Sequence, residues 1–585
     1  MAQDFDSTLH DIVYSIDAGT GLKIIRILLY VLVLFIVLTF YTATQFRGLS
    51  DSEAMDYAQL GRNYSFQNGL VTKCVRPVTM WKMAERTQGD PRIINHPDLF
   101  HPPAYPVLLS MGFRLFEVLG VDPFVMPEGS RSAILPAEQW VVLPINHFFT
   151  ILTGVLIFSL GKRLFTREIG LLGMSIYFLS DLVWADSISG LNIPMAAFFS
   201  VASFYSMVVA MLNRRDGKSK MRWMLPFLFS VVFSAIAFLT RYIAFAIVPG
   251  VVLFAWFMGG RFRGGTRFAI VFLLLYVLLI TPWLHRNYVL CGNPMGMALE
   301  TSLADTSRYP GHSFDRQLHP EFSVGKAIPA LKAKWGATYS EKYESIIPGL
   351  AGGFLLSFFV ATFFYRFVRP PANHLRWGLG VSILIMLVVA GVFTPSSVRT
   401  IHLFWPFIIL YGLAFYFVLI DRLDPEMRIY YTALKILIVL LAMFPLILRI
   451  LPPAAPSPYP PYYPPLVSKV SGMLNEREVM CTDMPWATAW YGNRVSLLLP
   501  KTLDDFYEIN DYKQYISGMY ITTLTKDKPF VSQLLDGPEK SWLPIISGRF
   551  PDDFPLKEAI SLNRQDQIFL SDRNRWSNLQ GAEQK

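Results

Sequence analysis

The stretch LLYVLVLFIVLTFY at positions 28–41 decides the class of protein. It carries no charge, and Lys23 and Arg26 precede it, as basic residues do at the cytoplasmic start of a membrane helix. No small-residue cleavage pattern follows it, so we interpret it as an uncleaved first span. Similar apolar blocks recur along the 585 residues, of which 53% are hydrophobic and only 16% charged. The sequence therefore predicts a polytopic membrane protein and excludes a soluble globule.

The charges between the apolar blocks set the expected topology. Fifteen Lys and Arg residues lie in five connections, namely 161–167, 213–222, 260–267, 369–376 and 421–428. The turns on the other side hold two, so the basic connections and the amino terminus are expected in the cytoplasm. An odd number of crossings must then precede residue 185. The weakest candidate, 104–120, carries Arg114 and Glu117, and we interpret it as an interfacial helix.

About eleven spans remain after that segment is removed. They are expected at 28–41, 140–160, 168–184, 193–212, 222–240, 242–259, 267–284, 350–368, 376–393, 402–420 and 429–450. The carboxyl terminus then lies outside the cytoplasm. The fold class is accordingly mainly α, with juxtamembrane helices in the first outer loop.

The same topology predicts the domains. A membrane domain, 1–450, contains two large outer loops at 42–103 and 285–349. A Pro-rich linker, 451–466, follows, with the sequence PPAAPSPYPPYYPP. The remaining residues, 467–585, contain the strand-like runs EVMCTD, RVSLLLP and SGMYITTL, separated by helical stretches. This pattern predicts a small extracytoplasmic α/β domain.

Composition also disfavours several functions. The predicted spans are nearly free of ionisable residues and show no internal repeat, which disfavours ion pumps and transporters built from repeated halves. The net charge of +9 is explained by membrane orientation, so no nucleic-acid partner is expected. Cys74, Cys291 and Cys481 are too few and too scattered for a disulfide framework or a zinc site.

Acidic residues gather where the first outer loop begins, in the stretch FRGLSDSEAMDYAQLGRN. Asp51, Glu53 and Asp56 lie within six residues, and on a helix Glu53, Asp56 and Tyr57 share one face. Carboxylates held this way are suited to abstract a proton or to bind a divalent metal. The alternative is a solvated helix start capped by Ser50 or Asp51.

Basic residues occur at four other outer ends. His101, Arg241, Arg286 and Arg399 would together form a site for an anion such as a phosphate at headgroup depth. Each one taken singly fits a lipid anchor equally well. His96, Asp98 and His101 are candidate metal ligands in a Pro-rich loop, so a divalent metal stays possible and no cofactor is certain.

These motifs, in this order, resemble the GT-C superfamily of polyprenyl-phosphate-dependent glycosyltransferases. The resemblance is to glycosyltransferase family 39, which includes protein O-mannosyltransferases and is related to bacterial aminoarabinose transferases, and it covers about residues 20–420. The family carries an acidic pair four and three residues before an aromatic residue. Here Glu53 and Ala54 precede Tyr57 at those positions. Glu53 therefore matches the catalytic acid position, with Asp56 and Asp51 as alternatives.

Four further motifs resemble those of the family, in chain order. His101-Pro102-Pro103 is similar to its basic-Pro-Pro motif, with His replacing Lys, and Gly190-Leu191-Asn192 is similar to an acidic outer turn of the aminoarabinose enzyme, with an amide replacing the carboxylate. Thr240-Arg241 resembles its Thr-Lys, and Pro282-Trp283 with Arg286 and Asn287 resembles its Pro-Trp ending. The resemblance implies that Arg241 binds the donor phosphate, with Arg286, Arg399 and His101 as further phosphate ligands.

The function implied is transfer of a sugar from a polyprenyl-phosphate donor to an extracytoplasmic acceptor (protein, glycan or lipid) by inverting displacement. Glu53 would take the acceptor's proton. The partners would be the lipid-linked donor, the acceptor and the bilayer. The expected location is the inner cell membrane, with the C-terminal domain in the periplasm. The alternatives are a secondary transporter and a non-catalytic protein that binds or assembles lipid-linked sugars.

Overall fold

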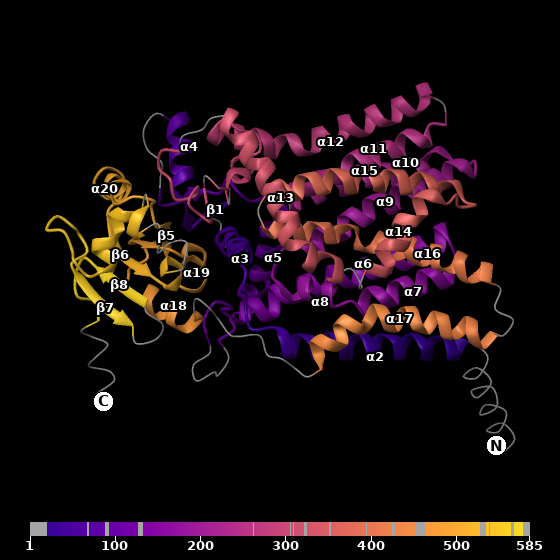
Figure 1. The fold of residues 1–585 in the computed structure, drawn as a ribbon, viewed down its shortest axis with the longest axis horizontal. Helices are drawn as coiled ribbons and strands as arrows, with labels where there is room; N and C mark the ends of the chain where they lie inside the picture. Colours follow the sequence, from indigo (N-terminus) through magenta and orange to yellow (C-terminus); the bar gives the residue numbers. More distant parts are fainter. Residues whose placement is uncertain are drawn as a thin grey trace, which may run out of the picture.

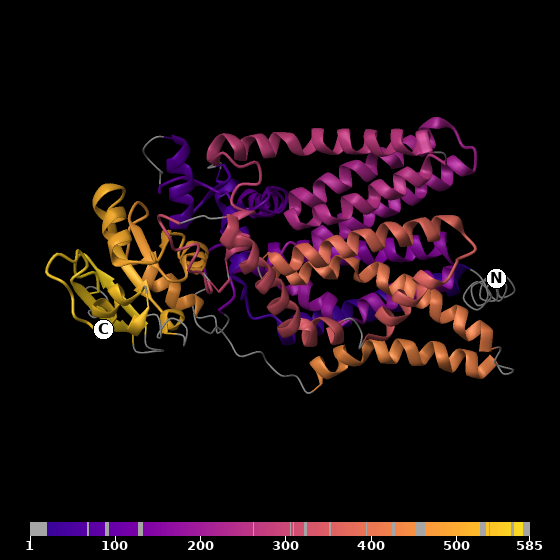
Figure 2. The ribbon, with the colours of Figure 1, turned by 45° about the horizontal axis from the view of Figure 1, so that its top comes forward.

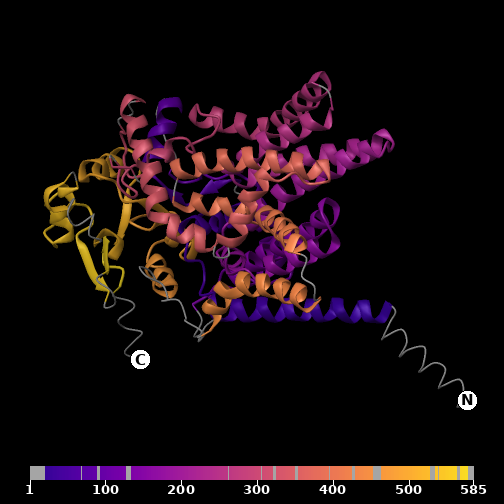
Figure 3. The ribbon, with the colours of Figure 1, turned by 45° about the vertical axis from the view of Figure 1, so that its right-hand side comes forward.

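The computed structural model describes most of the chain. The described residues are 20–66, 69–87, 93–126, 133–260, 262–304, 306–307, 309–320, 324–349, 353–393, 395–423, 428–451, 463–526, 534–537, 539–562 and 567–576. They form a helix bundle with a β-sheet domain beyond one end (Figure 1), an arrangement also seen in Figure 2 and Figure 3. Most of the predicted Pro-rich linker, 452–462, lies outside the described residues.

Within the described ranges, eight helices are long and apolar enough to cross a membrane. They are α2 (Thr20–Gln45), α6 (Leu143–Leu164, extended to Glu138 by a π-helical turn), α9 (Ile193–Arg215), α10 (Lys220–Thr240), α12 (Phe262–Cys291), α15 (Pro370–Val392), α16 (Trp405–Leu423) and α17 (Arg428–Ile450). A bent pair, α7 (Arg167–Phe178) and α8 (Asp181–Ile188), meets at 55° and adds a ninth if counted as one span. The chain is thus an integral multi-pass membrane protein.

The count of about eleven predicted spans is therefore too high by length. The expected span 242–259 is a 3₁₀ turn, Tyr242–Ala246, followed by the short helix α11 (Ile247–Met258). The expected span 350–368 contains the short helix α14 (Phe354–Ala361). A helix needs about 20 residues to cross the hydrocarbon core, and neither segment has them. Apolar composition identified both segments, but it does not report where a helix breaks.

Small residues let the membrane helices approach closely. A Cβ added to Gly161 of α6 would lie 2.6 Å from the Cα of Gly170 in α7, and one added to Gly250 of α11 would lie 2.2 Å from the carbonyl oxygen of Gly378 in α15. Larger side chains would force these helices apart. Close backbone contact supplies packing that the hydrophobic effect does not supply between helices in lipid.

The first outer loop folds into helices that cover one end of the bundle. These are α3 (Ser52–Ser65), α4 (Pro77–Thr87) and α5 (Ala104–Val118), and the second loop adds α13 (Val324–Gly349). The predicted interfacial segment 104–120 is α5, which buries Tyr105, Leu109 and Phe113 and leaves Leu115 and Val118 exposed. Its buried face packs against α3, where a Cβ on Gly61 would lie 2.9 Å from that of Leu109.

The tail forms a mixed sheet in the order β2-β5-β4-β6-β8-β7. Its own elements are α18 (Pro464–Ser471), β4 (Val479–Thr482), α19 (Pro485–Tyr491), β5 (Val495–Leu498), α20 (Leu503–Tyr512), β6 (Ile516–Ile521), α22 (Leu543–Ile546), β7 (Glu558–Leu562) and β8 (Gln567–Ser571). Strands β4, β5 and β6 coincide with the three strand-like runs of the sequence. The edge strand β2 (Cys74–Val75) does not belong to the tail, because it comes from the first outer loop and pairs parallel with β5.

Side-chain contacts reinforce this shared sheet. The Lys73 Nζ donates to the Asn493 Oδ1 at 2.6 Å, and the Tyr491 hydroxyl donates to the Leu49 carbonyl at 3.2 Å. The Trp490 indole donates to the Glu138 Oε1 at 2.8 Å, at the amino-terminal end of the membrane helix that continues into α6. A separate, smaller sheet has two strands, β1 (Val71–Thr72) and β3 (His96–Pro97), which pair antiparallel and join two parts of the first loop. The tail is consequently fastened to the loop that carries the predicted acidic residues.

Candidate active site

A cavity of about 800 Å³ lies where the two outer loops meet the end of α10. Six of the seven site residues predicted from sequence line it: Asp51, Glu53, Asp56, His101, Arg241 and Arg399. Arg286 is not among the lining residues. Residues up to 348 positions apart therefore converge on one hollow, and that convergence required the folded chain.

The first turn of α3 presents the acids to this cavity. Asp51 is the N-cap, with extended backbone angles, and its carboxylate accepts the Glu53 N–H at 3.0 Å. Asp51 thus caps the helix, as the alternative interpretation predicts, and Glu53 and Asp56 follow on the helix. Glu53, Asp56 and Tyr57 all line the cavity, as their spacing of three and four predicts for one helix face.

Glu53 and Arg241 form a two-pronged ion pair. The Arg241 Nη1 lies 2.9 Å from the Glu53 Oε1, and its Nη2 lies 3.2 Å from Oε2. Arg241 is the C-cap of α10, where its extended backbone ends the helix and turns the guanidinium toward α3. Glu53 keeps about a fifth of its side chain exposed in the cavity, whereas Arg241 is buried. The carboxylate is thus both oriented by a cation and accessible to a ligand.

Asn192 completes this group. Its Oδ1 accepts from the Arg241 Nη1 at 2.7 Å, while its Nδ2 donates to the Tyr57 hydroxyl at 2.8 Å and to the Thr240 carbonyl. The turn is held in place by Gly190 at φ +77°, where a Cβ would lie 2.3 Å from the Leu49 side chain. An amide here orients Arg241 without neutralising it, so Glu53 remains its principal anionic partner.

A second ion pair lies one turn along α3. The Arg76 Nη2 lies 2.5 Å from the Asp56 Oδ2, and the guanidinium stacks on the Phe100 ring at 4.4 Å. Asp56 is almost fully buried. Sequence reasoning missed Arg76, because nothing in its neighbourhood marks it except Pro77 at the start of α4.

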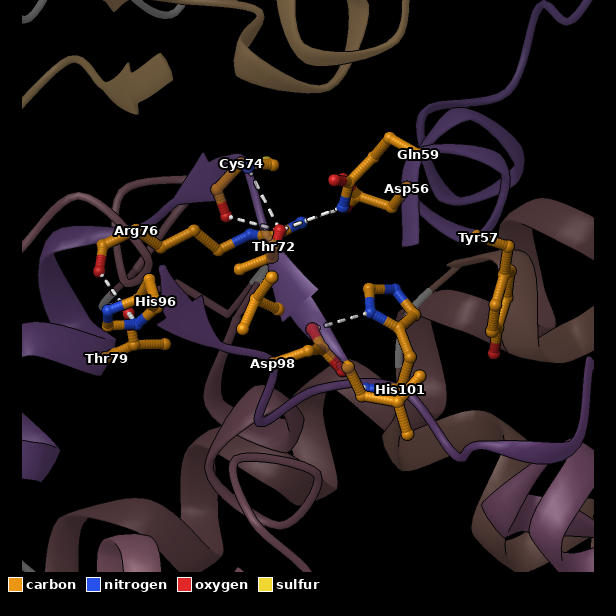
Figure 4. A network of polar contacts seen from close by, with 12 residues as sticks. Asp56, Tyr57, Gln59, Thr72, Cys74, Arg76, Thr79, His96, Asp98 and His101 are labelled. Atoms are coloured by element: carbon orange, nitrogen blue, oxygen red, sulfur yellow. Dashed lines mark hydrogen bonds and ion pairs between the residues drawn. The ribbon is translucent and has the colours of Figure 1, made fainter. Parts of the chain in front are cut away.

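His101 pairs with Asp98 rather than standing alone. Its Nδ1 lies 3.0 Å from the Asp98 Oδ1, and its backbone N–H donates to Oδ2 at 2.8 Å (Figure 4). Burial acts to lower the pKa of His101, but the charge and hydrogen bond of Asp98 outweigh it and raise that pKa above its ordinary value. Burial likewise opposes ionisation of Asp98, yet His101 holds the pKa of Asp98 below its usual range. The pair therefore favours an imidazolium beside a carboxylate.

The remaining predicted phosphate ligands differ in placement. Arg399 lies on the cavity wall with its side chain half exposed, 3.8 Å from the Asp51 carboxylate. Burial first, and the charge of Glu53 second, raise the pKa of Asp51. Arg286 instead donates to the carbonyl of Asp98 at 2.6 Å and stacks on the Trp283 ring. Arg286 thus supports the loop that holds His101 and does not reach the cavity itself.

The possible metal has no ligand set in the described part of the chain. No group of three or more His, Cys, Asp or Glu residues there is arranged to hold an ion. Of the three candidates, His96 bonds to the Thr79 hydroxyl at 2.8 Å, whereas Asp98 and His101 bond to each other. Figure 4 shows the two imidazoles at separate places in the polar network.

The chain is similar to known proteins in part of its sequence and in its fold. Residues 94–290 match the family model described as dolichyl-phosphate-mannose-protein mannosyltransferase. No curated protein matches the sequence. The fold is similar to that of ArnT from Cupriavidus metallidurans, solved with undecaprenyl phosphate, with a TM-score of 0.53, 13% identity and coverage of 95% of this chain and 99% of that one.

A second solved structure with this fold is the archaeal oligosaccharyltransferase AglB from Archaeoglobus fulgidus, in complex with an inhibitory peptide and a dolichol phosphate. Its TM-score is 0.55 at 10% identity, over 94% of this chain and 74% of that one. Identities this low show the fold alone. The resemblance predicted from sequence is confirmed to this extent: residues 94–290 match a model of the dolichyl-phosphate-mannose-protein mannosyltransferase family, and the chain shares the fold of ArnT and AglB.

Proposed function

We propose that the protein is a membrane glycosyltransferase that moves a sugar from a polyprenyl-phosphate donor to an extracytoplasmic acceptor. The observation that carries the proposal is the Glu53–Arg241 pair on the wall of a cavity of about 800 Å³. This pair places a candidate base beside a candidate phosphate ligand at the end of a membrane helix. The family match and the shared fold support the same class of reaction.

In the proposed reaction, a hydroxyl oxygen of the acceptor attacks the anomeric carbon of the donor sugar. The bond from that carbon to the phosphate oxygen breaks, the lipid phosphate leaves, and the configuration at the carbon inverts. Glu53 takes the proton of the attacking hydroxyl. Asp56 and Asp51 are weaker candidates for this role, because Asp56 is buried in its own ion pair and Asp51 caps α3.

The ion pair with Arg241 would make the activity of Glu53 as a base depend on binding of the lipid-linked sugar. Its guanidinium neutralises Glu53 in this structure, and a carboxylate held in a two-pronged ion pair is a poor base. The phosphate of the lipid-linked sugar, on binding Arg241, would compete with Glu53 for the guanidinium N–H groups and release Glu53 from the ion pair. Base activation would then depend on donor binding. Arg399, half exposed on the same wall, would bind the phosphate from the other side, and His101 is the more distant candidate.

The proposed orientation places the cavity outside the cytoplasm. The fifteen basic residues in five connections favour that orientation by the positive-inside rule. A polyprenyl tail would then stay in the bilayer while its phosphate reaches the boundary. The inner membrane of a bacterial cell, with the sheet domain in the periplasm, fits this arrangement.

The test is release of polyprenyl phosphate by the purified full-length chain from a panel of lipid-linked sugars. The Glu53→Gln variant should lower the rate by about a hundredfold or more, the usual range for loss of a general base. Glu508→Gln, an exposed acid of the tail, is the matched control and should leave the rate unchanged. Donor binding without any release would instead favour a non-catalytic assembly protein. Ion-driven uptake into proteoliposomes that survives Glu53→Gln would favour a transporter.

A further inference from the structure

A second polar group on the cavity wall is left unused by the proposed reaction. It consists of Asp56, Arg76 and Asp315, which all line the cavity. Asp56 is 1% exposed and Asp315 is 8% exposed. In each of the two, the Oδ1 atom is buried and has no hydrogen-bond partner among the described residues. Leaving a buried acceptor unsatisfied costs free energy, so two in one place call for an explanation.

The three residues form one group although they come from two loops. Asp56 is ion-paired with Arg76 at 2.5 Å. The Val78 N–H, two residues after Arg76, donates to the Asp315 carbonyl at 3.3 Å. The carboxylates of Asp56 and Asp315 both act electrostatically on the Arg76 guanidinium. The Arg76 guanidinium thus interacts with two carboxylates, and each carboxylate has one oxygen, Oδ1, without a hydrogen-bond partner among the described residues.

The tail holds this group in position. Arg76 directly follows β2, whose pairing with β5 fixes its place. Arg316 is next to Asp315 in the chain. Its Nη1 donates to both carboxylate oxygens of Glu539, at 2.9 and 2.8 Å, and its Nε donates to the Leu499 carbonyl at 2.7 Å. These buried contacts hold the backbone on either side of Arg76 and Asp315 against the tail.

The charge of the group selects the ligand chemistry. Within the group two carboxylates outnumber one guanidinium, and the His312 imidazole lies 3.7 Å from the Asp315 Oδ2 on the same wall. The free oxygens are acceptors only, so a ligand must bring hydrogen-bond donors. Asp56 also lies three residues from Glu53 on α3, a rise of about 4.5 Å along the helix axis. A molecule with one hydroxyl at Glu53 and neighbouring hydroxyls one sugar ring away matches both sites.

We propose that Asp56, Arg76 and Asp315 form an acceptor subsite that binds ring hydroxyls of a carbohydrate. The inference rests on the proposed function and deepens it, because it makes the acceptor a sugar rather than a serine or threonine of a protein. A hydroxyl of the sugar ring donates to each free carboxylate oxygen, and the Arg76 guanidinium donates to a ring or hydroxyl oxygen. A peptide acceptor offers one hydroxyl per residue and leaves one of the two acids unsatisfied.

The experiment compares Asp315→Asn with Glu508→Gln in the full-length protein. Glu508 pairs with His319 of the same loop at 2.9 Å, but of the two acids only Asp315 lines the cavity. The probes are methyl glycosides of common hexoses and pentoses, with a serine-containing peptide as comparator. We expect a methyl glycoside to accelerate release of polyprenyl phosphate, with a KM about tenfold higher in Asp315→Asn and an unchanged kcat, since a charged hydrogen bond to the acceptor is lost. Glu508→Gln should alter neither value.

Binding measured without turnover separates this inference from the proposed function. Saturation-transfer NMR should show a methyl glycoside bound to the wild type and lost in Asp315→Asn, even if no donor in the panel is cleaved. Such binding without any release would refute sugar transfer while supporting the subsite. Equal KM and equal binding in both variants would overturn the subsite, and so would turnover with the peptide but with no glycoside. Equal unfolding temperatures of the variants exclude misfolding as the cause.

Discussion

The two ion-paired acids of α3, Glu53 and Asp56, look alike in sequence and differ in their surroundings. Glu53 bonds to Arg241 through both oxygens and keeps 22% of its side chain exposed. Asp56 bonds to Arg76 through one oxygen and keeps 2% exposed. The first pair joins α3 to the end of a membrane helix, and the second joins it to the strand shared with the tail. In the proposed function the more exposed acid, Glu53, serves chemistry, whereas the buried Asp56 serves architecture and binding.

Neutralising each acid in turn tests most directly whether Glu53 and Asp56 have different roles. Glu53→Gln should lower kcat by about 10²- to 10⁴-fold, because general-base catalysis is lost. Asp56→Asn should mainly raise the KM for the acceptor, because Asp56 contacts the ligand but takes no proton. Release of polyprenyl phosphate under saturating donor measures both. An equal fall of kcat in the two variants would show that the two acids act as one catalytic pair.

Removing the cation of each pair tests how much each ion pair contributes to the stability of the fold. Arg76→Met leaves the Asp56 carboxylate buried without a partner, which should cost about 3–5 kcal/mol of stability. Arg241→Met should destabilise less, because Glu53 can be solvated from the cavity. Unfolding of the detergent-solubilised variants measures the difference. If Arg241→Met is the more destabilising change, burial does not explain the contrast.

Loss of the contacts between the tail and the second loop should reduce stability by a smaller amount. Glu539→Gln weakens the buried bonds to Arg316 and should cost about 1–3 kcal/mol. Glu508→Gln, which removes the exposed pair with His319 across the same boundary, should cost less than about 1 kcal/mol. Thermal unfolding of both variants provides the measurement. Comparable losses would mean that the boundary is held by its apolar contacts rather than by Arg316.

The smallest expected effect is a pH dependence of stability from His101. Its pKa is raised in the folded protein, so its contribution is fully present below its ordinary value of 6.5 and is lost as pH rises through the folded pKa. Asp98 has a lowered pKa, so its contribution is present above 3.8 and is lost only in stronger acid. His101→Gln should therefore flatten the stability profile above pH 6.5. An unchanged slope there would assign the titration to other groups.

Sequence reasoning found the half of the site that local pattern encodes. Glu53 and Tyr57 share a helix face by spacing, and Arg241 ends an apolar helix, so both signals are visible within a few residues. Arg76 and Asp315 were missed because their roles depend on the register of Cys74 against Ser496 and on the contacts of Arg316 with the tail. Such long-range pairing leaves no local trace. The same limit explains the span count, since a 3₁₀ turn at Tyr242 shortens a helix without changing its composition.

The parallel pairing of β2 with β5 has a consequence for biosynthesis. Lys73 and Asn493, which lock the two strands together, are 420 residues apart. At a translation rate of about 5–20 residues per second, the strand in the first loop waits roughly 20 to 80 s for its partner to emerge. Until then the tail does not hold β2, which directly precedes Arg76. A chain that stops before residue 495 would contain every membrane helix and still lack the strand that pairs with β2, so this part of the cavity wall is completed only after the tail has been translated.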